Sequence, residues 1–238
     1  MRTRIAVLAA IALCLAFTER TEDDALLPIP GAVLSNNIFG KGNITAYHQR
    51  IFHDEHATGW EWDWPANTGP AVKTYPEVII GRSPWSAASA AEILPRHLAD
   101  VHHTIEFDFA TTATGLWLNS FDFWITRADH PTQKDIVANL TIWAQNHGVE
   151  PSYKGRHETL EIGGRAYEAI FDTTKAWKTL CLIDKEPRTR GSLELRPLID
   201  ALIAHGLAQS TDYLATAEMG TEVPSGKGRT TVRVFSLR

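Results

Sequence analysis

The chain has 238 residues, of which 44% are hydrophobic and 21% are charged, and its formal net charge is -5. This composition is typical of a folded globular protein long enough for one large core, and it excludes a disordered chain. The mild acidity, without any block of basic residues, argues against a nucleic-acid partner.

The first 17 residues have the pattern of a secretory signal peptide. Arg2 and Arg4 precede an apolar run of about 13 residues that ends at Phe17, and the charged stretch TERTEDD follows. The run is shorter than the roughly 20 residues of a membrane-spanning helix, although an uncleaved anchor remains an alternative. We therefore expect a secreted, extracellular protein that has no membrane attachment after cleavage, with residues 18–30 as a linker.

Cysteines and histidines do not form a pattern of metal ligands. Once a signal peptide is removed, Cys181 is the only cysteine, so an internal disulfide and a cysteine-based metal site are both excluded. The histidines lack neighbouring carboxylates at ligand spacing. The sequence therefore predicts no metal and no cofactor, and we expect a monomer.

Short runs rich in β-branched and aromatic residues fill the chain beyond residue 31, separated by Gly, Pro, Asn and Asp. Their spacing of roughly 8 to 15 residues favours a β-sandwich or jelly roll. One helix is predicted at about 196–205, where apolar residues recur at helical spacing between Pro197 and Gly206. We predict one all-β domain over residues 31–238, a jelly roll of two antiparallel sheets with a concave cleft and this helix on the convex side.

Three tryptophans alternate with acidic residues in the stretch GWEWDWP. An extended strand places Trp60, Trp62 and Trp64 on one face and Glu61 and Asp63 on the other. Such a row is either buried core or a platform on which pyranose rings stack. We expect the row to open on the concave side of the sandwich.

A second alternating run, ANLTIW, covers residues 138–143. It places Asn139, Thr141 and Trp143 on one face of a strand and Leu140 and Ile142 on the other. The apolar face is expected to pack into the core, so the face that carries Asn139 lines the cleft.

From about residue 34 to the end, the chain resembles glycoside hydrolase family 12, whose members are endo-β-1,4-glucanases and xyloglucanases with a jelly-roll fold. NNIFG at residues 36–40 is similar to the family's Asn-Asn-x-Trp-Gly, and residues 62–85 are similar to its tryptophan strand and the Val-Lys-Ser-Tyr-Pro that follows. SFDFWIT at 120–126 and the segment 191–228 resemble its aspartate strand and its helix with the acid/base strand. The pieces occur in the family's order with similar spacing.

The resemblance implies an enzyme that degrades β-1,4-glucan, such as cellulose, xyloglucan or mixed-linkage glucan. Retaining hydrolysis needs two carboxyl groups about 5 to 5.5 Å apart. Glu222 in GTEVPSG matches the acid/base residue, and Asp122 in FDFW matches an aspartate that assists the catalytic pair. The residues that the family pattern places against the substrate are Asn37, Phe39, Trp62, Trp64 and Trp143.

The attacking carboxylate of the family lies in a Glu-hydrophobic-Met-hydrophobic-Trp strand, and the similar segment here begins with Asn139. An amide carries no charge and cannot form the glycosyl-ester intermediate. Asp135 is the nearest carboxylate upstream on the same face, but about 13 Å of strand separates it from Asn139 at some 3.3 Å per residue. Three interpretations stay open: an altered mechanism, a glucan-binding descendant of the family, or a different alignment of this strand with the family motif.

Overall fold

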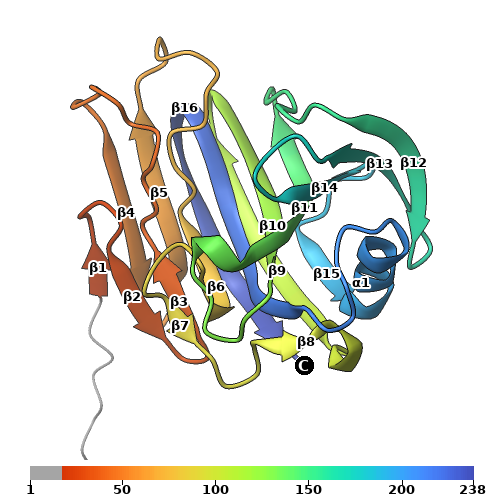
Figure 1. Ribbon diagram of the computed structural model, residues 1–238. Coiled ribbons are helices and arrows are strands. Elements are labelled where there is room, and N and C mark those ends of the chain that lie inside the picture. The colour runs from red at the N-terminus through yellow and green to blue at the C-terminus, as the bar shows by residue number, and fades with distance from the viewer. Residues whose placement is uncertain (1–17) are drawn as a thin grey trace, which may run out of the picture.

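The computed structural model describes residues 18–238 (Figure 1). The predicted signal peptide at residues 1–17 lies outside this range. No helix within residues 18–238 is long and apolar enough to cross a membrane.

Most of the chain forms two β-sheets, which we call the large and the small sheet. In the large sheet the strands lie in the spatial order β2-β3-β6-β16-β10-β11-β14-β13-β12, and β7 and β8 are short strands at its edge. Their bounds are β2 Leu26–Ile29, β3 Ala32–Ser35, β6 Glu77–Arg82, β7 Ser89–Ala90, β8 Arg96–His97, β10 Leu116–Thr126, β11 Ile136–His147, β12 Arg156–Ile162, β13 Arg165–Asp172, β14 Lys178–Asp184 and β16 Tyr213–Leu237.

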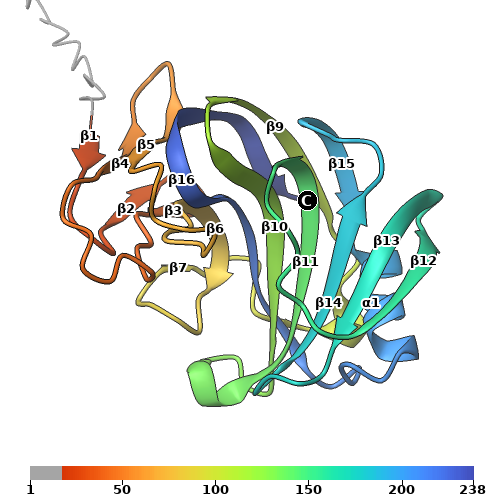
Figure 2. The ribbon, with the colours of Figure 1, turned by 90° about the horizontal axis from the view of Figure 1, so that it is seen from above.

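The small sheet has the spatial order β1-β4-β5-β16-β9-β15. Its strands are β1 Thr18–Arg20, β4 His48–His53, β5 Thr58–Trp64, β9 Thr104–Ala113 and β15 Arg190–Glu194. Two short 3₁₀ turns, Leu98–Asp100 and Gln133–Asp135, lie in the connections. Within residues 18–238, all strand pairs are antiparallel except β11 and β14 (Figure 2). These two run parallel because the connection after β11 crosses over so that β12 has the direction of β11, and the reversals into β13 and then β14 restore that direction.

Strand β16 belongs to both sheets. Up to Ser225 it pairs in the large sheet, and from Gly226 onward it pairs with β5 and β9 in the small one. Gly226 has φ +93°, and a Cβ there would lie 2.1 Å from the carbonyl oxygen of Thr114. Only glycine fits this bend, where the strand leaves one sheet for the other.

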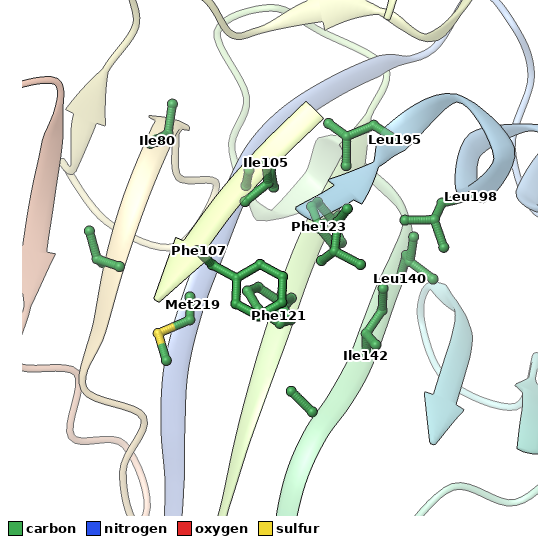
Figure 3. Close-up of a cluster of buried hydrophobic side chains, with 14 of the residues drawn as sticks. Ile80, Ile105, Phe107, Phe121, Phe123, Leu140, Ile142, Leu195, Leu198 and Met219 are labelled. Atoms are coloured by element: carbon green, nitrogen blue, oxygen red, sulfur yellow. The ribbon is translucent and has the colours of Figure 1, made fainter. Parts of the chain in front are cut away.

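The main hydrophobic core lies between the two sheets (Figure 3). Alternate residues of β10 and β11, including Phe121, Phe123, Leu140 and Ile142, point into it. The helix α1, Leu195–Ala204, adds its buried face to the same core through Leu195, Leu198, Ile199 and Leu202. The predicted jelly roll with one α-helix is thereby confirmed for the described residues, while one strand pair of the predicted antiparallel sheets, β11 and β14, is parallel.

One predicted boundary is wrong. Residues 18–30 are not a linker, because they contain β1, which pairs with β4, and β2, which pairs with β3. Leu27 in β2 is buried in the main core, so this segment is part of the domain.

Candidate active site

The face of the large sheet that is turned away from the main core carries four acidic side chains on β6, β10 and β16; we call this face the site face. Along β6, β10 and β16, core residues alternate with residues of opposite orientation, because successive side chains of a strand point to opposite faces. The acidic residues in this second set are Glu77, Asp122, Glu218 and Glu222.

The strand β11 presents Asn139, Thr141 and Trp143 on the site face, while Leu140 and Ile142 lie in the main core. The two faces predicted for this strand are therefore as observed. The pairing of β10 with β11 sets Trp124 opposite Asn139 and Asp122 opposite Thr141. Asn139 and Asp122 thus become diagonal neighbours.

Asn139 and Asp122 are joined by a hydrogen bond. The Asn139 Nδ2 donates to Asp122 Oδ1 over 3.1 Å, and the Ser120 hydroxyl donates to Asp122 Oδ2 over 2.9 Å. Burial raises the pKa of Asp122, while hydrogen bonds from Asn139, Tyr75 and Ser120 act in the opposite direction. The amide therefore satisfies a buried carboxylate and offers no attacking oxygen anion of its own.

Glu222 lies on β16, opposite Leu118 of β10. Burial, followed by the negative charge of Asp122, raises its pKa to about 8, and the positive charge of Lys175 opposes this shift. A glutamic acid with this pKa holds its proton at neutral pH, which is the form that a proton donor to a leaving oxygen needs.

Two further carboxyl groups were missed by sequence reasoning. Glu77 of β6 and Glu218 of β16 are 4% and 3% exposed, and they lie next to each other across the sheet. Burial raises the pKa of Glu218 to about 7 and places that of Glu77 well above its ordinary value, and their mutual interaction adds to the shift of Glu77. A usable signal was present, since Glu77 begins the run EVII and Glu218 interrupts the run ATAEMG, both of which are otherwise made of apolar and small residues.

Asn37 and Phe39 precede this region in the chain and follow β3. Asn37 is half-buried, and its Nδ2 donates to Glu77 Oε1 over 3.0 Å. Phe39 is 62% exposed, and the backbone amide beside it donates to the Lys73 carbonyl. Asn37 thus joins the carboxyl groups of the site face, and Phe39 offers an open aromatic surface.

The tryptophan row of β5 is in a different place from the one we expected. Trp62 and Trp64 are 2% and 1% exposed and pack, with Trp60, in the main core from the side of the small sheet. The indole of Trp64 stacks on Tyr47 and donates to Gln49. The prediction that the row opens on the concave side is wrong, because β5 belongs to the small sheet and its apolar face closes the core.

Trp143 lies on the site face but is only 4% exposed. It packs in a second, smaller apolar cluster with Leu118, Val149, Ile170 and Cys181. Its indole edge is therefore covered by neighbouring side chains in this structure.

Three other tryptophans form a cluster that sequence reasoning did not single out. Trp124 of β10 meets Trp85 and Trp177, from the loops that follow β6 and β13, with ring centroids 5.1 and 5.8 Å away. Trp85 and Trp177 contact each other at 5.3 Å. Because Trp124 lies opposite Asn139, this aromatic cluster borders the candidate site.

The structure therefore brings together Asn37, Asp122, Asn139 and Glu222 on one face and leaves Trp62 and Trp64 in the core. What the site face can do chemically is donate a proton from Glu222 and accept hydrogen bonds at its other carboxyl groups. Position 139 carries an amide, which neither donates a proton as an acid nor attacks as a carboxylate.

Comparison with known proteins places this fold and sequence in a family. Residues 30–238 match glycosyl hydrolase family 12. Endoglucanase S of Pectobacterium parmentieri is 27% identical over 207 residues, which cover 82% of this chain and 77% of the relative.

Solved structures show the same fold. The native family 12 xyloglucanase of Bacillus licheniformis matches with a TM-score of 0.84 and 22% identity, covering 93% of this chain and 99% of that one. An endoglucanase of Rhodothermus marinus matches with a TM-score of 0.79 and 21% identity, covering 92% and 97% of the two chains. Because the family match extends over nearly all of the described residues, the resemblance seen in the motifs is confirmed, and the chain belongs to glycosyl hydrolase family 12.

Proposed function

We propose that this protein is a secreted member of family 12 that acts on β-1,4-glucans on the site face of its large sheet. The observation that carries the proposal is the group formed by Glu222, Asp122 and Asn139. Glu222 has the raised pKa of a proton donor, and Asp122 and Asn139 are hydrogen-bonded neighbours on adjacent strands. Asn37 and Phe39 supply a hydrogen-bonding and an aromatic group for the sugar chain.

In this proposal Glu222 protonates the glycosidic oxygen while the C1–O bond breaks. Ordinary retaining hydrolysis then needs a carboxylate on the opposite side of C1, and the similarity of residues 139–143 to the family's nucleophile strand assigns this role to position 139. An uncharged amide stabilises an oxocarbenium ion poorly and forms no glycosyl ester. Loss of one member of a catalytic unit commonly lowers kcat by a factor on the order of 1,000 or more.

The second candidate function is glucan binding without hydrolysis. It is favoured by the hydrogen bond that Asn139 donates to Asp122. Because the Asp122 carboxylate accepts this bond, it is less available to attack a sugar. Both candidates share the sugar-binding groups and differ in whether a bond is cleaved. They also share the substrate class, which includes cellulose, xyloglucan and mixed-linkage glucan.

The experiment that separates the two incubates the purified protein with each soluble β-glucan and measures new reducing ends alongside affinity for cello-oligosaccharides. Binding with few or no new reducing ends supports the second candidate. Robust hydrolysis shows that another residue or a water performs the attack, and the anomer of the first product tells which. Absence of both binding and hydrolysis contradicts the proposed function.

Secretion and a monomeric state belong to the same proposal. The support is the basic and apolar N-terminal sequence, which is typical of a signal peptide. Expression of the full chain in a secreting host should release a monomer into the medium with its N-terminus near residue 18.

A further inference from the structure

Glu77 and Glu218 present an unusual arrangement, because two buried carboxyl groups face each other on the site face. Glu77 Oε1 accepts a hydrogen bond from Asn37, and Glu218 Oε2 accepts one from the Trp124 indole over 3.1 Å. Among the described residues, the other two oxygens, Glu77 Oε2 and Glu218 Oε1, are buried and have no donor with good hydrogen-bond geometry. The Thr216 hydroxyl, on the same strand as Glu218, acts to lower the pKa of Glu218 but is itself without a hydrogen-bond partner.

Two buried acceptors next to each other are unfavourable unless a proton lies between them. The electrostatics agree with this requirement. A hydrogen bond with Glu218 raises the pKa of Glu77, whereas the same bond lowers that of Glu218. This is the expected pattern when Glu77 holds the proton and donates it to Glu218.

The shared proton completes a chain of four side chains. It runs from Asn37, which follows β3, through Glu77 on β6 and Glu218 on β16 to Trp124 on β10. At one end is an amide that can bind a sugar hydroxyl. At the other end is the indole that contacts Trp85 and Trp177.

We propose that Glu77 and Glu218 are positioning residues that share one proton and thereby hold Asn37 and Trp124 in the arrangement that binds glucan. The inference rests on the proposed function, since it assumes that the sugar chain lies on the site face. Neither carboxyl group needs to touch the substrate, because each acts through the side chain that donates to it.

Other titratable groups lie close to Glu77 and Glu218 and affect how readily these two residues ionise. Asp122 on β10 lies opposite Glu218, and its negative charge disfavours ionisation of both glutamates. Tyr75, in the segment before β6, has its pKa raised by burial and by the negative charges of Asp122 and Glu77. Glu222 follows Glu218 on the same face of β16, with Gly220 between them under the Tyr75 ring.

When the shared proton is lost, two adjacent carboxylates repel each other in a buried place. One of them must move, and the movement releases Asn37 or Trp124. Glucan affinity should therefore be highest in acid and fall as the pH rises.

The test compares single amide substitutions of the pair. In Glu218→Gln the side-chain oxygen still accepts from Trp124 and the new N–H donates to Glu77. In Glu77→Gln the oxygen still accepts from Asn37 and the new N–H donates to Glu218. Each single variant therefore keeps the chain of hydrogen bonds, but an amide N–H replaces the proton that Glu77 and Glu218 share. In the double variant two amide N–H groups point at each other, so this hydrogen bond is lost.

The readout is the affinity for cellohexaose, measured by titration calorimetry from about pH 5 to about pH 9. For the unmodified protein we expect affinity to fall about tenfold or more over this range, since one unit of pKa linkage corresponds to a tenfold change. Both single variants should bind cellohexaose at about pH 5 as tightly as the unmodified protein does. Their affinity should change little as the pH rises to about 9. The double variant should bind more weakly at every pH.

Glu168→Gln is the control, because Glu168 is an exposed carboxyl group on β13 that lies outside the chain of four side chains. It should leave the fall in affinity in place. If Glu168→Gln alone flattens the profile, or if both single variants keep the full fall, the proposal is wrong.

Unfolding by urea at each pH gives a readout that needs no glucan. A carboxyl group whose pKa is raised in the folded state stabilises the fold below its unfolded pKa, and this stabilisation is lost as the pH rises through the folded pKa. The unmodified protein should lose stability between about pH 4.5 and the folded pKa of the pair, and each single variant should lose less. If no protein binds cellohexaose, the proposed function fails, and an unchanged stability profile in both variants would also contradict the shared proton.

Discussion

At the scale of single residues, the contacts of Asn139 show what its amide does on the site face. A glutamate at this position would set a second negative charge beside buried Asp122, whereas Asn139 donates a hydrogen bond to it. The exchange therefore relieves a repulsion between like charges and removes an attacking group. Thr141, the next residue on the site face, is buried, and its hydroxyl acts with the other donors to lower the pKa of Asp122.

A first prediction concerns Glu222 as the proton donor. In a protein that carries Asn139→Glu, adding Glu222→Gln should lower the restored hydrolysis of β-glucan by about 100-fold or more, because general acid catalysis typically contributes that much. The rate should also fall as the pH rises through the pKa of Glu222. Reducing-end assays across pH measure both effects, and an active double variant would assign the acid to another residue.

The sequence allowed Glu222, Asp122 and Asn139 to be found because each lies in a recognisable motif. Glu77 and Glu218 could not be paired in the same way. Their strands are separated by more than 130 residues, and only the sheet order sets β6 beside β16. Alternation in a strand shows which residues share a face, but it does not show which strands are neighbours.

At the scale of elements, β5 also shows that alternation along a strand does not reveal the neighbours of that strand. The alternation of Trp60, Trp62 and Trp64 correctly predicted that the three indoles share a face, which is the buried one. Whether that face closes a core or opens to a ligand depends on the sheet to which the strand belongs. The helix was easier, since its apolar spacing and the residues Pro197 and Gly206 fix its place to within a residue or two.

A second prediction follows for the tryptophan row. Trp62→Ala should lower the free energy of unfolding by about 3–5 kcal/mol, as expected for a large buried side chain. Asp63→Ala, on the exposed face of the same strand, is the control and should change it by less than about 0.5 kcal/mol. Urea denaturation gives both values. If Trp62→Ala leaves the stability unchanged and weakens glucan binding, the prediction is wrong and the tryptophan row belongs to the binding site.

At the scale of the whole molecule, β16 holds the two sheets together. It pairs with β6 and β10 on one side of Gly226 and with β5 and β9 on the other. The fold class could be predicted from local patterns of short β-type runs. These distant pairings could not, because they join segments far apart in the chain.

A third prediction tests the N-terminal boundary of the domain. A protein that starts at residue 31 should be less stable than one that starts at residue 18, because it lacks β1 and β2 and the buried Leu27. Loss of the Leu27 contacts alone should cost about 2–5 kcal/mol. Denaturant unfolding of the two proteins compares them, and equal stability would show that residues 18–30 contribute nothing to the fold.

The central claim is that this is a family 12 site in which Asn139 replaces the attacking carboxylate. The most direct measurement is the release of reducing ends from soluble β-1,4-glucan by the unmodified protein and by Asn139→Glu, with product anomers followed by NMR. We expect little or no hydrolysis by the unmodified protein and partial activity with retention in Asn139→Glu, limited by Thr141 and the surrounding side chains. Rapid hydrolysis by the unmodified protein, or an Asn139→Glu variant that binds glucan but remains inactive, would contradict this claim.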